Sequence, residues 1–433
     1  MTDNFIAPVL DIKHPRKHLS AFKTPLGVRG VYDSVSFCSR CGNCQQSCPT
    51  LKLFEKEVFS PRGRNQAVRL LLEGKLRKEE NKKILKETSF SCLLCGRCTL
   101  HCAGKVPTAH HMLELRRTLG NRNLPFLLQF ILEIRNRIPS FFSFLILTGH
   151  FFRRWGFFRL LRGLQITRIP CLQWLNHADD ILPRQFRPLK KLLPTAKNFS
   201  HPDGFYLPSF EAEFLDTNLG LKSVELLQNK KNIRIWHNTS SGLFEYVYGD
   251  LRRSRMIVRR LILRLEKTGR KTFLATDSID VYNFFMSVPQ LFAGNSFWEK
   301  KAELFTNRVR FIGDFLPKRK KSPYGEQPVR LDEAALFSQE NEAVLHMREI
   351  LKTQFKKNFV ECFYTVANTP SFGYSFSQPE ITEKIMLSVV RDCAQTQTGT
   401  VFLLSGLCAL ELSFHLKKFY PYAKAKHITC LHG

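Results

Sequence analysis

Two runs of four cysteines constrain this chain more than any other feature of its sequence. The first run is Cys38, Cys41, Cys44 and Cys48, followed by Pro49, and the second is Cys92, Cys95, Cys98 and Cys102. Both have the spacing C-x-x-C-x-x-C-x-x-x-C. Three thiolates placed two residues apart can bind three corners of one iron–sulfur cubane. The sequence therefore predicts that all eight cysteines ligate iron–sulfur clusters.

The fourth cysteine of each run follows a longer step, which directs its thiol away from its own run. In bacterial two-cluster ferredoxins, a fourth cysteine at this spacing ligates the cluster held by the other run. We therefore predict two [4Fe–4S] clusters that exchange one ligand. The first takes Cys38, Cys41, Cys44 and Cys102, and the second takes Cys92, Cys95, Cys98 and Cys48.

Gly42 and Gly96 occupy the same place in each run. A glycine there lets the backbone approach an inorganic sulfide and direct N–H groups at it, so both are predicted cofactor-binding residues. The alternative for each is an ordinary turn glycine. Structural zinc is the competing metal, but zinc sites usually take two ligand pairs separated by a longer stretch. Covalent haem is excluded because no C-x-x-C-H occurs.

The stretch between the runs is predicted to be helical. Ser60-Pro61 forms a turn before a helix over residues 65–72, and a charged helix is expected over 75–86. Arg62 and Arg64 are candidates to brace the cluster loops or to dock an acidic partner. Helix between the runs, in place of the short hairpins of small ferredoxins, indicates a helical ferredoxin module.

Cysteine usage and charge bear on compartment and partners. Eight of the 13 cysteines lie in the two runs, and the start Met1–Phe5 has neither the basic residues nor the apolar run of a secretory signal. We therefore expect a cytoplasmic protein. The formal net charge of +29 favours anionic partners, namely an acidic subunit, an anionic membrane surface or nucleic acid. No nucleic-acid motif occurs, so no specific nucleic acid is expected. A surface made basic for solubility is the alternative.

Residues 121–175 form a basic aromatic segment. Between residues 134 and 178 there are seven arginines and no acidic residue. Pro139, His150 and an arginine pair interrupt the apolar runs, so none reaches the roughly 18 residues that a transmembrane helix needs. Aromatic residues on one side with arginines on the other predict a helix lying in the membrane interface, peripheral on its inner face. The alternative is a core helix with exposed arginines.

The predicted fold class is α+β multidomain, a helical two-cluster ferredoxin module followed by two tandem α/β units with parallel sheets. Strands are expected at 233–236, 272–275, 309–312, 329–331, 359–363, 401–404 and 427–430. The predicted division is a tail (1–30), the ferredoxin domain (31–120), the basic aromatic segment (121–175), a linker with short helices (176–231), the first α/β unit (232–316), a linker (317–328) and the second α/β unit (329–433).

The order of these parts resembles the iron–sulfur subunit of glycolate oxidase and its relatives in lactate utilisation, anaerobic glycerol-3-phosphate dehydrogenase and heterodisulfide reductase. The resemblance rests on the two cysteine runs, on Ser60-Pro-Arg-Gly-Arg64 and on the tandem units, over residues 31–433. The family's units each carry a Cys-Cys-Gly core, but this chain has Asn368–Tyr374 at that place and keeps only Cys408. We therefore expect degenerate units without a third cluster.

The resemblance implies an electron-transfer subunit that is not catalytic alone. It would accept electrons from a flavoprotein dehydrogenase acting on a 2-hydroxy acid or similar substrate, and pass them through the two clusters toward quinone or another acceptor. The alternative is an iron–sulfur interaction scaffold or sensor without turnover, which the degenerate units motivate. His101, His110 and His111 are not expected to be ligands, because the cysteines already satisfy both clusters.

Overall fold

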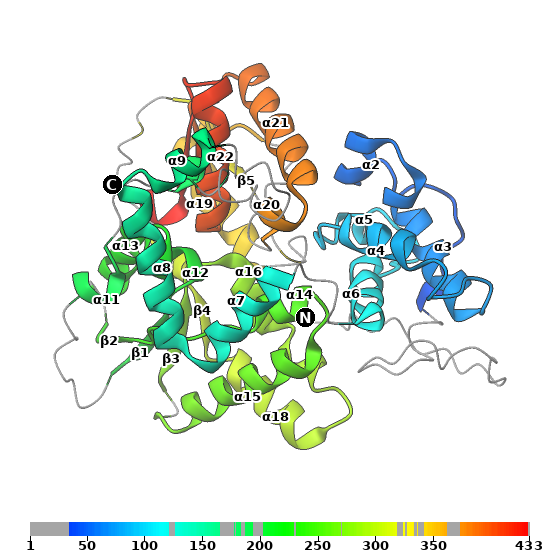
Figure 1. Ribbon diagram of the computed structural model, residues 1–433, viewed down its shortest axis with the longest axis horizontal. Helices are drawn as coiled ribbons and strands as arrows, with labels where there is room; N and C mark the ends of the chain where they lie inside the picture. Colours follow the sequence, from blue (N-terminus) through cyan, green and yellow to red (C-terminus); the bar gives the residue numbers. More distant parts are fainter. Residues whose placement is uncertain are drawn as a thin grey trace.

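The structure is a computed structural model of the 433-residue chain. It describes residues 34–120, 126–164, 177, 179–182, 187–193, 202–228, 231–269, 271–317, 324, 327–332, 336, 342–361 and 373–431. This part of the chain is mixed helical and α/β, with two sheets of parallel strands, which confirms the predicted fold class at that level. The helices around the cysteine runs gather on one side of the molecule, and the sheets with their helices form the other (Figure 1). The predicted tail 1–30 lies outside the described residues.

The cysteine runs lie in loops between short helices. These are α2 (Pro49–Phe54), the 3-10 helix η2 (Glu57–Phe59), α3 (Pro61–Leu72), α4 (Lys82–Phe90), α5 (Arg97–Leu100) and α6 (Thr108–Leu119). α6 packs against both α3 and α4. The charged helix expected over 75–86 is displaced, because α4 begins only at Lys82 and continues to Phe90. Burial of Leu85 and Phe90 in the core stabilises this later helix.

The first sheet has the parallel strand order β2-β1-β3-β4. Its strands are β1 (Gly204–Leu207), β2 (Ile233–Ile235), β3 (Phe273–Thr276) and β4 (Val309–Phe311). The prediction of a linker over 176–231 is wrong for residues 204–207, because these residues form β1 in the middle of the sheet. The four residues of β1 lie between Pro202 and Pro208 and show no alternation, because the strand is buried throughout.

Helices follow each strand of the first sheet. They are α12 (Phe210–Phe214), α13 (Thr217–Gln228), α14 (Leu243–Val247), α15 (Leu251–Glu266), α16 (Ile279–Met286), α17 (Val288–Leu291) and α18 (Ser296–Thr306). The single helix expected over 246–266 divides into α14 and α15. Gly249 lies between them with φ +88°, and a Cβ there would come within 2.6 Å of the Arg117 backbone nitrogen. Only glycine allows this close approach between the first unit and α6.

The second sheet has the parallel order β5-β6-β7. Its strands are β5 (Val329–Asp332), β6 (Thr400–Leu403) and β7 (Lys424–His427), and its helices are α19 (Glu342–Phe355), α20 (Tyr374–Ser377), α21 (Pro379–Gln395) and α22 (Gly406–Phe419). The strand predicted over 359–363 is reduced to one bridge from Phe359 to Val329, and residues 362–363 lie outside the described residues.

The last strand is shifted relative to the prediction for 427–430. β7 ends at His427, and residues 428–430 form the 3-10 helix η9. The backbone N–H of Thr429 donates to Nδ1 of His427, so the His427 side chain caps this turn.

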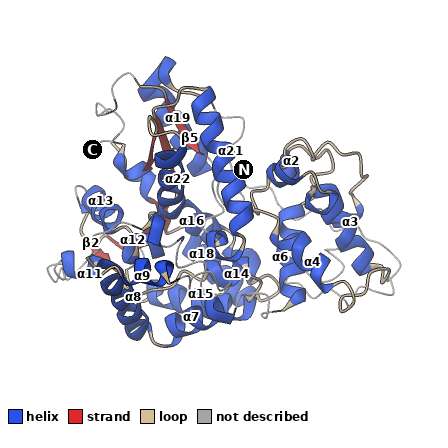
Figure 2. Cartoon of the chain, turned by 45° about the horizontal axis from the view of Figure 1, so that its top comes forward, coloured by secondary structure: helices blue, strands red, loops and turns tan. Residues whose placement is uncertain are grey.

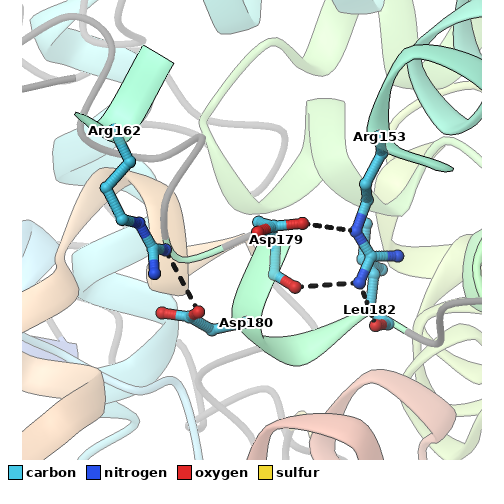
Figure 3. A network of polar contacts seen from close by, with 5 residues as sticks. All are labelled: Arg153, Arg162, Asp179, Asp180 and Leu182. Atoms are coloured by element: carbon cyan, nitrogen blue, oxygen red, sulfur yellow. Dashed lines mark hydrogen bonds and ion pairs between the residues drawn. The ribbon is translucent and has the colours of Figure 1, made fainter. Parts of the chain in front are cut away.

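The basic aromatic segment contains α7 (Phe126–Arg137), α8 (Pro139–Arg154) and α9 (Phe157–Gly163). Arg153 donates to Oδ1 and the carbonyl of Asp179 at 2.8 Å each, and Arg162 reaches Asp180 at 3.1 Å (Figure 3). These bonds attach α8 and α9 to residues 179–182. Among the described residues, no helix has the length and apolar character needed to cross a bilayer.

One hydrophobic core extends from the cysteine-run helices into the two α/β units. It includes Leu85 and Met112 from the former and Val247, Phe284 and Ile385 from the latter. α2 contacts α21, on the side of the C-terminal half that faces the cysteine runs (Figures 1 and 2). Lys384 of α21 lies 4.2 Å from the ring centroid of Phe54. The N-terminal helices are therefore packed against the second unit as well as the first.

Candidate iron–sulfur site

The segment between the cysteine runs forms a tight helix start that carries two arginines toward the thiols. Ser60 caps α3 by accepting a hydrogen bond from the Gly63 N–H at 2.8 Å, and Pro61 begins the helix. A Cβ on Gly63 would lie 2.1 Å from the carbonyl oxygen of Glu57. This glycine is therefore required by a close backbone approach, and it fixes where Arg62 and Arg64 leave the helix.

The structure brings Cys102 to the thiols of the first run. Burial, followed by the neighbouring Cys102 and Cys38 thiols, raises the pKa of Cys44 to about 11. Cys41 is exposed, and Cys38, Cys44 and Cys102 are half-buried. These four residues line one cavity that opens on the surface. The first thiol group thus gathers the four cysteines predicted to bind one cluster, on a face that solvent reaches.

The structure likewise brings Cys48 to the second run. Burial raises the pKa of Cys98 well above its ordinary value, and the Cys92, Cys95 and Cys48 thiols raise it further. Burial also raises the pKa of Cys95 to about 11. Cys48, Cys92 and Cys95 are all buried. Three of the four thiols of the second group are therefore interior, and the fourth, Cys98, is half-buried and lines the same cavity as the first group.

Both predicted glycines have left-handed backbone angles. Gly42 has φ +89° and Gly96 has φ +74°, which L side chains rarely adopt. Gly96 precedes α5 directly, and a Cβ on Gly42 would come within 3.0 Å of the Gln45 side chain. Both positions therefore need glycine for the turn itself, and their role toward a sulfide stays a prediction.

Arg62 and Arg64 divide between the two thiol groups. Arg62 pairs with Glu57 at 2.8 Å and interacts electrostatically with Cys44 and Cys38. Arg64 is buried, and its Nη2 donates to Thr50 and Ser91 at 2.9 Å each. Burial works to lower the pKa of Arg64, but the Cys92 and Cys48 thiols outweigh it and raise that pKa. One helix turn thus places a guanidinium beside each group.

Two further residues lie at the second thiol group that the sequence did not predict, because no motif near them in the chain indicates this position. Arg116 of α6 donates from Nη2 to the Cys92 carbonyl at 2.7 Å and to the Tyr374 hydroxyl at 2.5 Å. The Tyr374 hydroxyl donates to the same Cys92 carbonyl at 3.1 Å. Arg116 and Tyr374 are 258 positions apart in the chain. Their only sequence signal is the position of Tyr374 in the stretch where Cys-Cys-Gly was expected.

Two sets of four thiols are the ligand sets that two [4Fe–4S] clusters take. No group of three or more His, Cys, Asp or Glu among the described residues converges as the ligands of one metal ion would. Four thiolates around a cubane stand farther apart than four around one ion, because the cubane itself separates them. Burial, as the largest cause, raises the pKa of both Cys44 and Cys95, so a bound cation would favour their thiolate forms.

Comparison with known proteins agrees with this chemistry over the cysteine-run region. Residues 34–106 match the family model described as a 4Fe-4S dicluster domain. An 84-residue stretch is 34% identical to the glycolate oxidase iron-sulfur subunit of Escherichia coli (strain K12), and this match covers 19% of this chain and 19% of that protein. No solved structure matches. Residues 34–106 are therefore similar to a 4Fe-4S dicluster domain, and through this stretch the chain resembles the iron–sulfur subunit of glycolate oxidase.

Proposed function

We propose that this protein is the electron-transfer subunit of an oxidoreductase complex. It holds two [4Fe–4S] clusters, on Cys38, Cys41, Cys44 and Cys102 and on Cys92, Cys95, Cys98 and Cys48. The observation that carries this proposal is the grouping of eight thiols into two sets of four, each with one member from the other run. When bound, such clusters supply one-electron chemistry. The substrate reaction belongs to a partner subunit.

The partner is a flavoprotein dehydrogenase that oxidises a 2-hydroxy acid or similar substrate, and electrons continue toward quinone or another acceptor. Exposed Cys41 supports electron exchange at the first thiol group, because electron transfer weakens with distance and Cys41 is the one exposed thiol among the eight. Exposed Arg40 and Lys105 lie on the loops of this site. Their charge favours a partner with an acidic rim around its cofactor.

The protein acts in the cytoplasm, on the inner face of the membrane. Support comes from α8 and α9, whose exposed residues combine Phe144, Phe151 and Trp155 with Arg154 and Arg159. Apolar side chains of this size suit the boundary between headgroups and acyl chains, and arginines suit anionic lipid.

Iron and acid-labile sulfide per chain, measured on anaerobically purified protein, test the cluster assignment. We expect about eight iron per chain and interacting EPR signals after reduction. About twelve iron would mean that the C-terminal units hold a further cluster. Zinc in place of iron would overturn the electron-transfer assignment.

Reduction by the substrate and the flavoprotein together tests the electron path. We expect bleaching of the cluster absorbance that reverses on oxidation. The second candidate is an interaction scaffold or sensor, favoured by the loss of Cys-Cys-Gly from the C-terminal units. It predicts clusters that do not cycle reversibly, so the same experiment separates the two.

A further inference from the structure

Three separate parts of the chain meet at Arg116, beside the second thiol group. Its side chain is wholly buried. It donates to the carbonyls of Cys92 in the cluster loop, of Ser89 at the end of α4, and of Val247 in the first α/β unit, the last at 2.9 Å. Arg116 also donates to the hydroxyl of Tyr374, which is wholly buried and belongs to the second α/β unit. Five hydrogen bonds of one guanidinium thus join the cluster loop to both units.

The charge of Arg116 is held in a region of low dielectric. Its guanidinium lies 4.7 Å from the centroid of the Phe90 ring, whose face attracts a cation. Buried charges act over longer distances than exposed ones, because water does not screen them. Any negative charge that develops around Cys92 is therefore stabilised by Arg116.

Tyr374 gives the second α/β unit its part in this arrangement. It begins α20 directly after Gly373, whose φ of +70° directs the chain back toward the cysteine loops. The hydroxyl both accepts from Arg116 and donates to the Cys92 carbonyl. It also interacts electrostatically with the Cys92 thiol. Tyr374, at the end of the stretch where Cys-Cys-Gly was expected, thus contacts a cluster loop.

We propose that Arg116 and Tyr374 are positioning residues that raise the reduction potential of the second cluster, so that the second α/β unit closes over this cluster and tunes it. This inference rests on the proposed electron-transfer function. One electron from the flavoprotein adds one negative charge to a site that already carries about two, and no bond or proton changes. Arg116 favours this added charge, and the Tyr374 hydroxyl holds the Cys92 carbonyl and the guanidinium in place.

Redox titration of the holoprotein, followed by EPR, tests the proposal with the variant Arg116→Gln. We expect the equilibrium constant for reducing the second cluster to fall about tenfold, which is about 59 mV for a one-electron couple. The first cluster should keep its potential. Arg116→Lys, which retains the charge, should recover part of the loss. The matched control is Arg117→Gln, since Arg117 is the next residue on α6 but pairs with Glu114 at 2.8 Å.

The variant Arg62→Gln identifies which signal belongs to which cluster, because Arg62 interacts with Cys44 and Cys38 of the first group. Arg62→Gln should shift the potential of the first cluster and leave that of the second unchanged. If Arg116→Gln does not fold, Tyr374→Phe removes one hydroxyl without a cavity and should lower the same equilibrium constant about twofold to threefold. A second-cluster potential equal to wild type in the folded variants would overturn the proposal. A wild-type protein that does not cycle at all would instead overturn the proposed function.

Discussion

Arg64 Nη1 donates to Sγ of Cys48 over 3.5 Å, from a position closed to solvent. Cys48 belongs to the first run in sequence but lies with the thiols of the second. The same guanidinium bonds to Thr50 beside Cys48 and to Ser91 beside Cys92. Arg64 therefore joins the end of one run to the start of the other, at the point where we propose the ligand exchange.

The variant Arg64→Met should lose the second cluster preferentially. Removing the guanidinium leaves the Thr50 and Ser91 hydroxyls and the Thr88 carbonyl without this partner in a buried site, which costs about 1–3 kcal/mol. We expect iron per chain to fall toward half and the unfolding temperature to decrease. Iron analysis and thermal unfolding under anaerobic conditions measure both.

Arg69→Met is the matched control for this experiment. Arg69 lies on the same helix and pairs with Glu73 at 2.8 Å, with a third of its side chain exposed. This variant should keep its iron. Equal iron loss in both variants would show that α3 tolerates no such substitution, and that the contact with Cys48 is not the cause.

Gly63→Ala should destabilise the cysteine-run helices by roughly 1–3 kcal/mol, because the new Cβ would lie 2.1 Å from the Glu57 carbonyl oxygen and force the backbone apart. Gly149→Ala is the control, since nothing lies within 4 Å of a Cβ there and alanine favours the helix α8 by roughly 1 kcal/mol. Chemical unfolding of both variants gives the comparison. A Gly63→Ala protein as stable as wild type would contradict the close approach.

The cysteine runs predicted the thiol grouping at the site because the spacing itself limits which thiols can share a cluster. The structure brings Cys102 and Cys48 to the groups that the spacing assigns them. Arg116 and Tyr374 could not be found this way. Their contacts join residues 258 positions apart, and a buried arginine in a helix has no periodic signature.

The strands were predicted correctly where strands and helices alternate regularly along the chain. The prediction failed where a segment becomes a strand only through pairing with its neighbours in the sheet. β2 to β6 lie close to their expected positions. β1 was assigned to a linker, because its partners β2 and β3 follow it in the chain and its four buried residues carry no pattern. Pairing with two neighbours, not local propensity, makes it a strand.

Asp277 should make the stability of the first α/β unit depend on pH. Burial, followed by the nearby Glu211, raises the pKa of Asp277 from 3.8 to about 7. A raised carboxyl pKa contributes stability below pH 3.8 that is lost as pH rises toward 7, because the unfolded chain ionises first. The free energy of unfolding can fall by at most about 4 kcal/mol, because each unit between the unfolded and the folded pKa corresponds to 1.36 kcal/mol.

The variant Asp277→Asn should remove this dependence of stability on pH, because asparagine does not ionise. Oδ1 of Asp277 accepts from the Ser209 N–H at 2.8 Å, and the amide oxygen of asparagine can accept the same bond. We expect the variant to gain stability over wild type as pH increases from 5 to 8, measured by chemical unfolding. A difference between the two proteins that is constant over this range would contradict the raised pKa.

The aromatic surface of α8 and α9 should bind anionic vesicles, and Trp155 should contribute most, because 76% of its side chain is exposed. Burying a large apolar side chain stabilises by about 1.5–3 kcal/mol, so Trp155→Ala should weaken co-sedimentation roughly tenfold or more. Phe297→Ala is the control, since Phe297 is 63% exposed but lies on α18. Salt should weaken binding of both proteins through the arginines. Equal binding by the Trp155 variant and wild type would contradict insertion of this surface into the membrane interface.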